Sequence, residues 1–162
     1  MTSKRILSVT VANKPGVLSR ITGLFSRRNY NINSLNVGET ENPEYSRMTI
    51  VVDADDRTLE QIKSQLDKLV EVIQITELDR TNIVDRDLAL IRVNSSRSQR
   101  SEIIQIVDTF RARIVDLSTD TIMIEATGTP SKIEALIEIL KDFGIIDIVR
   151  TGLVALNRGV VE

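Results

Sequence analysis

The feature of this sequence that most constrains its fold is an order of predicted elements that occurs twice. Along residues 4–78, apolar alternation and helical apolar stripes predict strand, helix, strand, strand, helix and strand. The same order follows along residues 87–151, although the two halves match poorly in sequence. This order is that of the split βαβ, or ferredoxin-like, unit. The sequence therefore predicts an α+β protein with two tandem ferredoxin-like βαββαβ domains.

The first half contains the clearest strand and helix signals. Strands are expected at residues 4–12, 31–39, 45–53 and 71–78. Two helices are predicted from apolar stripes, the first made of Val17, Leu18, Ile21, Leu24 and Phe25 and the second of Leu59, Ile62, Leu66 and Leu69. Asn29 suits the left-handed stop after the first helix, and Asp55 or Asp56 suits the cap of the second.

The second half repeats these signals after a polar stretch. Strands are expected at residues 87–94, 112–118, 121–127 and 144–151. The helix stripes are Ile103, Ile104, Val107 and Phe110, and then Ile133, Leu136, Ile137 and Leu140. We therefore expect a first domain at residues 1–79, a linker at residues 80–86 and a second domain at residues 87–162, of which residues 152–162 form a tail.

Three residue types that carry much protein chemistry are missing from the sequence. The chain has no Cys, His or Trp, and its net charge is −2. These counts argue against thiolate nucleophiles, cysteine-ligated metals, histidine bases, aromatic stacking on bases and a basic field for nucleic acid. The first residues lack the apolar region of a signal peptide, and no apolar run approaches the ~20 residues of a membrane span. We expect a soluble, cytoplasmic protein.

The turn between the first strand and the first helix is the best candidate for a binding site. Asn13, Pro15 and Gly16 precede a helix start, where unpaired N–H groups and about half a positive charge favour a carboxylate or phosphate. Gly16 lets a ligand approach the backbone, and the Asn13 amide offers a donor and an acceptor. This mixture suits an α-amino acid. An ordinary strand–helix turn capped by Asn has the same spacing, so both interpretations stay open.

An amino-acid site also needs an apolar wall and further polar contacts. Val17, Leu18 and Ile32 are candidates for the wall, and Asn31 is a candidate polar contact from the same chain or a neighbouring subunit. A unit of about 80 residues buries a small core and leaves sheet edges open. We therefore expect at least a homodimer whose sheets meet edge to edge or face to face.

Several segments resemble one known family. Residues 13–35 (NKPGVLSRITGLFSRRNYNINSL) resemble the first motif of an ACT domain, and in detail that of the regulatory small subunit of acetolactate synthase, or acetohydroxyacid synthase. The resemblance continues through residues 45–52, 59–75 and 150–159 and so covers nearly the whole chain. Two positions depart from the family pattern. Asn29 stands where Gly is usual, and Asn33 stands where Glu is usual, which removes one charge near the site.

This resemblance implies a non-catalytic function in branched-chain amino acid biosynthesis. Family members bind the acetolactate synthase catalytic subunit, raise its activity and confer feedback inhibition by valine. Asn13, Gly16 and Asn31 match polar and backbone positions of the family's effector site, which lies between two ACT domains of a dimer. The first domain would then be the ACT domain, and the second would contact the catalytic subunit. No metal or cofactor is expected in this chain; thiamine diphosphate, Mg²⁺ and FAD are expected on the partner.

Other functions are possible for such a sequence. A free-standing ACT-domain sensor would act on another partner, although no clustered basic helix indicates direct DNA binding. A ferredoxin-like acyl-phosphate hydrolase would need an Arg in the first turn, where this chain has Lys14 and Pro15. An RNA-binding module would need aromatic residues on its middle strands. Asp53, Asp55 and Asp56 could hold Mg²⁺ or Ca²⁺, but a helix-capping loop explains them better.

Overall fold

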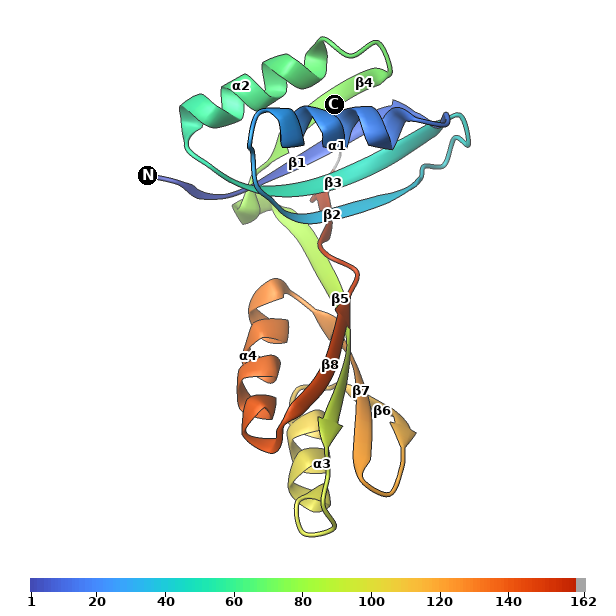
Figure 1. The fold of residues 1–162 in the computed structure, drawn as a ribbon, viewed down its shortest axis with the longest axis vertical. Helices are drawn as coiled ribbons and strands as arrows, with labels where there is room; N and C mark the ends of the chain where they lie inside the picture. The colour runs from blue at the N-terminus through green and yellow to red at the C-terminus, as the bar shows by residue number, and fades with distance from the viewer. Residues whose placement is uncertain (160–162) are drawn as a thin grey trace. The chain divides into compact units, whose positions relative to one another are not determined.

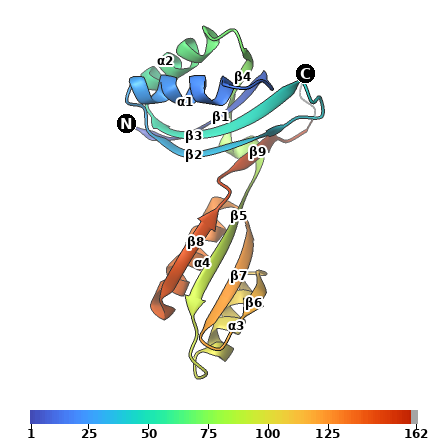
Figure 2. The same cartoon turned by 45° about the vertical axis from the view of Figure 1, so that its right-hand side comes forward.

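The computed structural model describes residues 1–159 and divides the chain into two compact units. Unit 1 comprises Met1–Val84 together with the residues after Gly152, and unit 2 comprises Asp85–Gly152. In each unit the elements follow the order βαββαβ, and two helices cover one face of an antiparallel sheet (Figure 1, Figure 2). The predicted α+β fold with two ferredoxin-like repeats is confirmed.

Unit 1 contains a four-stranded sheet in the order β2-β3-β1-β4. Its strands are β1 (Ser3–Ala12), β2 (Ile32–Glu39), β3 (Tyr45–Ala54) and β4 (Val72–Leu78). Its helices are α1 (Val17–Arg27) and α2 (Asp56–Asp67). Asn29 lies beyond the end of α1 with φ of 57°, the left-handed conformation predicted for it.

The core of unit 1 lies between the sheet and its two helices. Residues that alternate along β1 and β3 point to this side, and they include Leu7, Val9, Met48 and Ile50. The helices contribute the buried residues Val17, Ile21, Leu24, Phe25, Leu59, Ile62 and Leu66. Leu69 follows the end of α2 and still packs against this core. Apolar periodicity therefore predicted most of the core correctly.

Unit 2 repeats the topology with the strand order β6-β7-β5-β8. Its strands are β5 (Ile83–Asn94), β6 (Arg113–Leu117), β7 (Thr121–Gly128) and β8 (Ile145–Arg150), and its helices are α3 (Arg100–Thr109) and α4 (Pro130–Leu140). Ile103 and Val107 of α3 are buried, whereas Ile104 is 37% exposed, so its predicted place in the core is wrong. Adjacent helix positions point about 100° apart, and Ile103 occupies the core-facing one. None of the helices in the described chain is long and apolar enough to cross a membrane.

Two boundaries differ from the predicted domain division. The expected linker at residues 80–86 is ordered as a 3₁₀ turn (Arg80–Asn82) and the start of β5. The expected tail contains β9 (Val154–Asn157), which pairs with β5. Residues 153–159 therefore belong to unit 1 rather than to the second domain, and the rest of the predicted tail, residues 160–162, lies outside the described residues.

A second apolar cluster explains why the C-terminal segment returns to unit 1. Leu153 and Ala155 are buried in it together with Ile6, Val51, Leu78 and Ile83. Ile6 and Val51 alternate with core residues of β1 and β3, so they point to the sheet face opposite the helices. The returning segment thus covers apolar residues that this face would otherwise expose to water.

Candidate functional site

The β1–α1 turn leaves backbone donors at the start of α1 without acceptors. Gly16 is the N-cap residue with φ of +85°, and no side chain caps the helix. Within residues 1–159, the N–H groups of Leu18 and Ser19 have no hydrogen-bond acceptor, while the Val17 N–H makes a long 3.4 Å bond to the Lys14 carbonyl. The left-handed backbone at Gly16 strains any residue with a Cβ. This position can therefore present open N–H groups to a ligand.

The start of α1 also differs electrostatically from the other described α-helix starts. The start of α1 has neither a capping side chain nor an acidic residue in its first turn. Asp55 caps α2, Thr129 caps α4, and Glu102 lies in the first turn of α3. The positive end of the α1 dipole is thus uncompensated by the chain itself, which favours binding of an anion.

Asn13 lies beside this helix start and is held by the β2–β3 hairpin. Its Nδ2 donates to the Pro43 carbonyl at 2.9 Å and to Glu39 Oε1 at 3.2 Å, and its backbone N–H donates to the Glu44 carbonyl at 2.8 Å. Both donors of the amide are therefore used within the chain. Its Oδ1 accepts no hydrogen bond from the described residues, so it can accept one from an ammonium group.

The candidate wall residues lie in different environments. Val17 is buried in the core of unit 1, so its side chain is not an open wall. Leu18 is 46% exposed beside the free N–H groups and offers the apolar surface instead. The expectation of an apolar wall at this turn therefore rests on Leu18.

Within one chain, Asn31 and Ile32 lie far from Asn13 and Gly16. Ala12, at the end of β1, pairs with Tyr45, whereas Ile32, at the start of β2, pairs with Val52. Tyr45 and Val52 are seven residues apart on β3, a separation of about 23 Å at the rise of a strand. Figure 1 shows the start of β2 and the start of α1 at opposite ends of the sheet. One chain alone thus supplies only part of the predicted residue set.

Arg20, Glu39 and Glu71 lie at this turn and were not predicted as site residues. Arg20 forms an ion pair with Glu71, and its Nη1 lies 3.4 Å from the point where a Cβ on Gly16 would be. The i, i+4 spacing of Gly16 and Arg20 could have indicated this proximity. Glu39 became visible only with the hairpin fold, because it is far from Asn13 in sequence.

The acidic loop before α2 has a structural explanation. Asp55 Oδ1 accepts from the Thr58 N–H at 2.7 Å, and this bond, with the Thr58 side chain, lowers the pKa of Asp55. Asp53 accepts from Asn33 Nδ2 at 2.9 Å, and Asp56 pairs with Arg5 at 2.8 Å. The predicted cap is confirmed for Asp55. Across residues 1–159, no group of three or more acidic, His or Cys side chains could hold a metal ion.

The fold and the open helix start together define an ACT-like domain followed by a second ferredoxin-like domain. Two families match the chain: one described as "AHAS small subunit-like ACT domain" over residues 7–74, and one described as "Small subunit of acetolactate synthase" over residues 86–159. The chain belongs to the acetolactate synthase small-subunit family.

Whole-chain relatives support this assignment. The acetolactate synthase small subunit of Mycolicibacterium smegmatis is 52% identical over 98% of this chain and 93% of its own length. The small subunit of Bacillus subtilis is 50% identical over 96% of this chain and 91% of its own length. The crystal structure of the small subunit from Thermotoga maritima superposes with a TM-score of 0.90 at 45% identity, covering 98% of this chain and 99% of that one.

Proposed function

We propose that this chain is a non-catalytic regulatory subunit that binds the acetolactate synthase catalytic subunit in the cytoplasm, raises its activity and makes it sensitive to valine. Membership of the small-subunit family supports a catalytic partner. Thiamine diphosphate, Mg²⁺ and FAD would be held by that partner, where the chemistry takes place. This chain would contribute an effector site and a contact surface.

The observation that carries the proposal is the pairing of free N–H groups with a free amide oxygen at one turn. The N–H groups of Leu18 and Ser19 suit an α-carboxylate, and Asn13 Oδ1 suits an α-ammonium. Leu18 adds exposed apolar surface for an aliphatic side chain. Together these groups match the three parts of a branched-chain amino acid.

A second copy of the chain would complete this site. β2 is an edge strand, so two copies can pair their β2 strands antiparallel about a two-fold axis. Such pairing brings the start of one β2 strand beside the end of the other. Asn31 and Ile32 of one copy would then approach Glu39 of its partner, which already contacts Asn13. We therefore propose a homodimer with two effector sites, each formed by both copies.

The effector regulates only if it binds two arrangements of the dimer unequally. Burial of an isopropyl group contributes about 2 kcal/mol, whereas one methylene discriminates by about 1–3 kcal/mol. Apolar contact alone thus separates valine from leucine or isoleucine only weakly, and the choice of valine follows the family resemblance.

The test uses the full chain, the catalytic subunit and valine. We expect calorimetry to show valine binding to the chain, and a reconstituted assay to show activation without valine and inhibition with it. Asn13→Ala should weaken inhibition by about 5–150-fold in valine concentration and leave activation intact, because it removes a polar contact of about 1–3 kcal/mol. Asn94→Ala is the matched control, since Asn94 ends the first strand of unit 2.

Three outcomes separate the alternatives. An Asn13→Ala subunit that stays fully valine-sensitive would show that the assigned site is wrong. Valine binding without any effect on the synthase would favour a free-standing sensor with another partner. Absence of binding by every branched-chain amino acid, with or without the synthase, would reject the proposal.

A further inference from the structure

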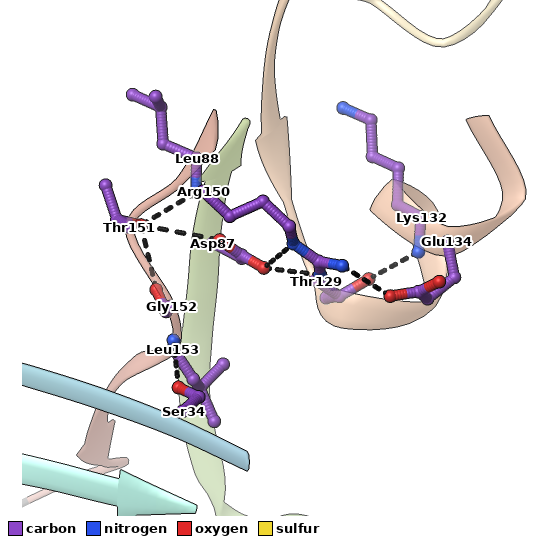
Figure 3. Close-up of polar contacts among 10 residues, drawn as sticks. All are labelled: Ser34, Asp87, Leu88, Thr129, Lys132, Glu134, Arg150, Thr151, Gly152 and Leu153. Atoms are coloured by element: carbon purple, nitrogen blue, oxygen red, sulfur yellow. Dashed lines mark hydrogen bonds and ion pairs between the residues drawn. The ribbon is translucent and has the colours of Figure 1, made fainter. Parts of the chain in front are cut away.

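We propose that the Ser34 hydroxyl is a positioning contact that connects occupancy of the effector site to the C-terminal segment that returns from unit 2 to unit 1. The inference rests on the proposed function and concerns how that site regulates. Ser34 lies on β2, and its Oγ accepts a hydrogen bond from the Leu153 N–H at 3.0 Å (Figure 3). Both residues belong to unit 1, although 118 residues separate them in the sequence.

The strand around Ser34 is locally irregular at the point nearest the proposed effector. The register of β2 on β3 shifts between Ile32 and Ser34, which leaves Asn33 as an extra residue. Asn33 Nδ2 donates to Asp53 Oδ2 at 2.9 Å and so ties this bulge to the end of β3. A bulge bends its strand and weakens the local ladder. A ligand contact at Asn31 or Ile32 can therefore displace Ser34 at less cost than in a regular strand.

The segment that Ser34 holds is fixed on both sides of Gly152. On the unit 1 side, Leu153 is buried in the apolar cluster on the open sheet face. On the unit 2 side, Thr151 Oγ1 donates to the Gly152 carbonyl at 2.8 Å and accepts from the Leu88 N–H at 3.2 Å (Figure 3). Gly152 is the single residue between these two anchored positions.

Arg150, the last residue of β8, forms further contacts within unit 2. Its Nε and Nη2 donate to Asp87 Oδ2 at 2.9 and 2.6 Å, and its Nη1 donates to Glu134 Oε1 at 2.6 Å (Figure 3). Asp87 is buried, whereas Glu134 is exposed, and Arg150 bonds both carboxylates and so joins β5, β8 and α4. Three residues of chain, 150–152, thus connect Leu153 with this part of unit 2.

This arrangement assigns Ser34 a transmitting role without ligand contact. Without the hydroxyl, the Leu153 N–H loses its acceptor, and a change at Ile32 no longer acts directly on the returning segment. Ser34 is not among the residues that we propose to contact the effector. The expected defect is thus confined to the coupling between valine and inhibition.

The test compares Ser34→Ala, Ser34→Thr and Ser26→Ala in the full chain with the catalytic subunit. We expect Ser34→Ala to bind valine within about twofold of the unmodified chain and to activate the synthase normally, while its inhibition at saturating valine shrinks at least about fivefold, the low end of allosteric coupling. Ser34→Thr keeps the hydroxyl and should restore inhibition. Ser26, an exposed serine of α1, is the control and should have no effect.

A second measurement does not depend on how the variants fold. Valine should change the hydrogen-exchange rate of the Leu153 amide in the unmodified chain, read by NMR. An unchanged rate, or a Ser34→Ala subunit inhibited as strongly as the unmodified one, overturns the inference while leaving the proposed function intact. A chain that binds no valine overturns both.

Discussion

The first strand–helix turns of the two units have the same place in the topology but different side chains around the helix start. In unit 1 the turn ends in Gly16, and the N–H groups at the helix start are open. In unit 2 the N–H groups of Ser101 and Glu102 at the start of α3 likewise have no acceptor within residues 1–159, but the Glu102 carboxylate lies in this first turn. The N–H groups of Gln99 and Arg100 bond the Ser96 carbonyl, and the Ser96 hydroxyl donates to Gln99 Oε1 at 3.0 Å.

The difference shows that topology alone does not make a site. Arg100 of unit 2 donates to the carbonyls of Ser118 and Thr119 and so bonds the turn to the β6–β7 hairpin. At the corresponding hairpin of unit 1, the Asn13 amide uses only its donors and keeps an acceptor. A repeated fold therefore offers an anion site where the helix start lacks an acidic side chain, and a structural turn where an acidic side chain occupies the first turn.

The largest expected effect comes from closing the open turn. Gly16→Asp would place a carboxylate at the helix start, where it competes with the effector's carboxylate for the N–H groups. We expect valine affinity to fall at least about 100-fold and inhibition of the synthase to be lost, with calorimetry as the measurement. The left-handed φ of Gly16 adds backbone strain.

The control for this change is Gln99→Asp at the N-cap of α3. Its backbone has φ of −93°, so the substitution adds no left-handed strain. We expect unchanged valine affinity and unchanged inhibition. If Gln99→Asp weakened valine binding as much as Gly16→Asp, the contrast between the two turns would be wrong.

The next largest effect tests to which of the two units the C-terminal segment belongs. Leu153→Ala removes a buried side chain from the cluster around Ile6 and Val51 and should lower the free energy of unfolding by about 2–4 kcal/mol. Native-state hydrogen exchange should show the loss in β1 and β3 of unit 1. A loss confined to β5 and β7 would instead assign the segment to unit 2.

This C-terminal segment also shows where sequence-based prediction stopped. The periodic stripes of α1, α2 and α4 gave the right core apart from the exposed Leu18, because each helix buries one continuous face. β9 is only four residues long, and its partners are distant in the chain, so nothing local distinguished it from a tail. The same reason hid Glu39, which meets Asn13 only through the hairpin.

The residues of the candidate site also differ in whether local sequence could predict them. Gly16 and Asn13 could be found from the Asn-x-Pro-Gly turn, because the chemistry of a helix start is local. The burial of Val17 and the distance of Asn31 depend on packing and sheet register, which a single sequence does not show directly. Whether two copies share one site is therefore a question for valine binding by the dimer.

A smaller effect is expected from removing the side-chain contacts of the unit 2 turn. Arg100→Ala removes the donors to the Ser118 and Thr119 carbonyls and should lower the free energy of unfolding by about 1–2 kcal/mol. Urea unfolding measures this loss. Calorimetry should show that the variant turn binds no valine, because Glu102 still lies in the first turn of α3 and repels a carboxylate. A second valine site in this variant would contradict that explanation.

The smallest expected effect concerns the helix caps, which differ chemically between the two units. Asp55 of unit 1 can be protonated, whereas Thr129 of unit 2 cannot. The Thr58 N–H holds the pKa of Asp55 below its ordinary value of 3.8. A carboxyl with a lowered pKa stabilises the fold fully above its unfolded pKa, and this stabilisation is lost as the pH falls through the folded pKa.

Urea unfolding between about pH 6 and pH 3 should therefore distinguish Asp55→Ala from Thr129→Ala. The destabilisation by Asp55→Ala should be constant near neutral pH and shrink once the pH falls below about 4, because the protonated carboxyl accepts less well from the Thr58 N–H. The destabilisation by Thr129→Ala, about 1 kcal/mol, should stay the same throughout. Equal pH dependence in both variants would mean that the acid sensitivity of the fold has another source than the ionisable cap of α2.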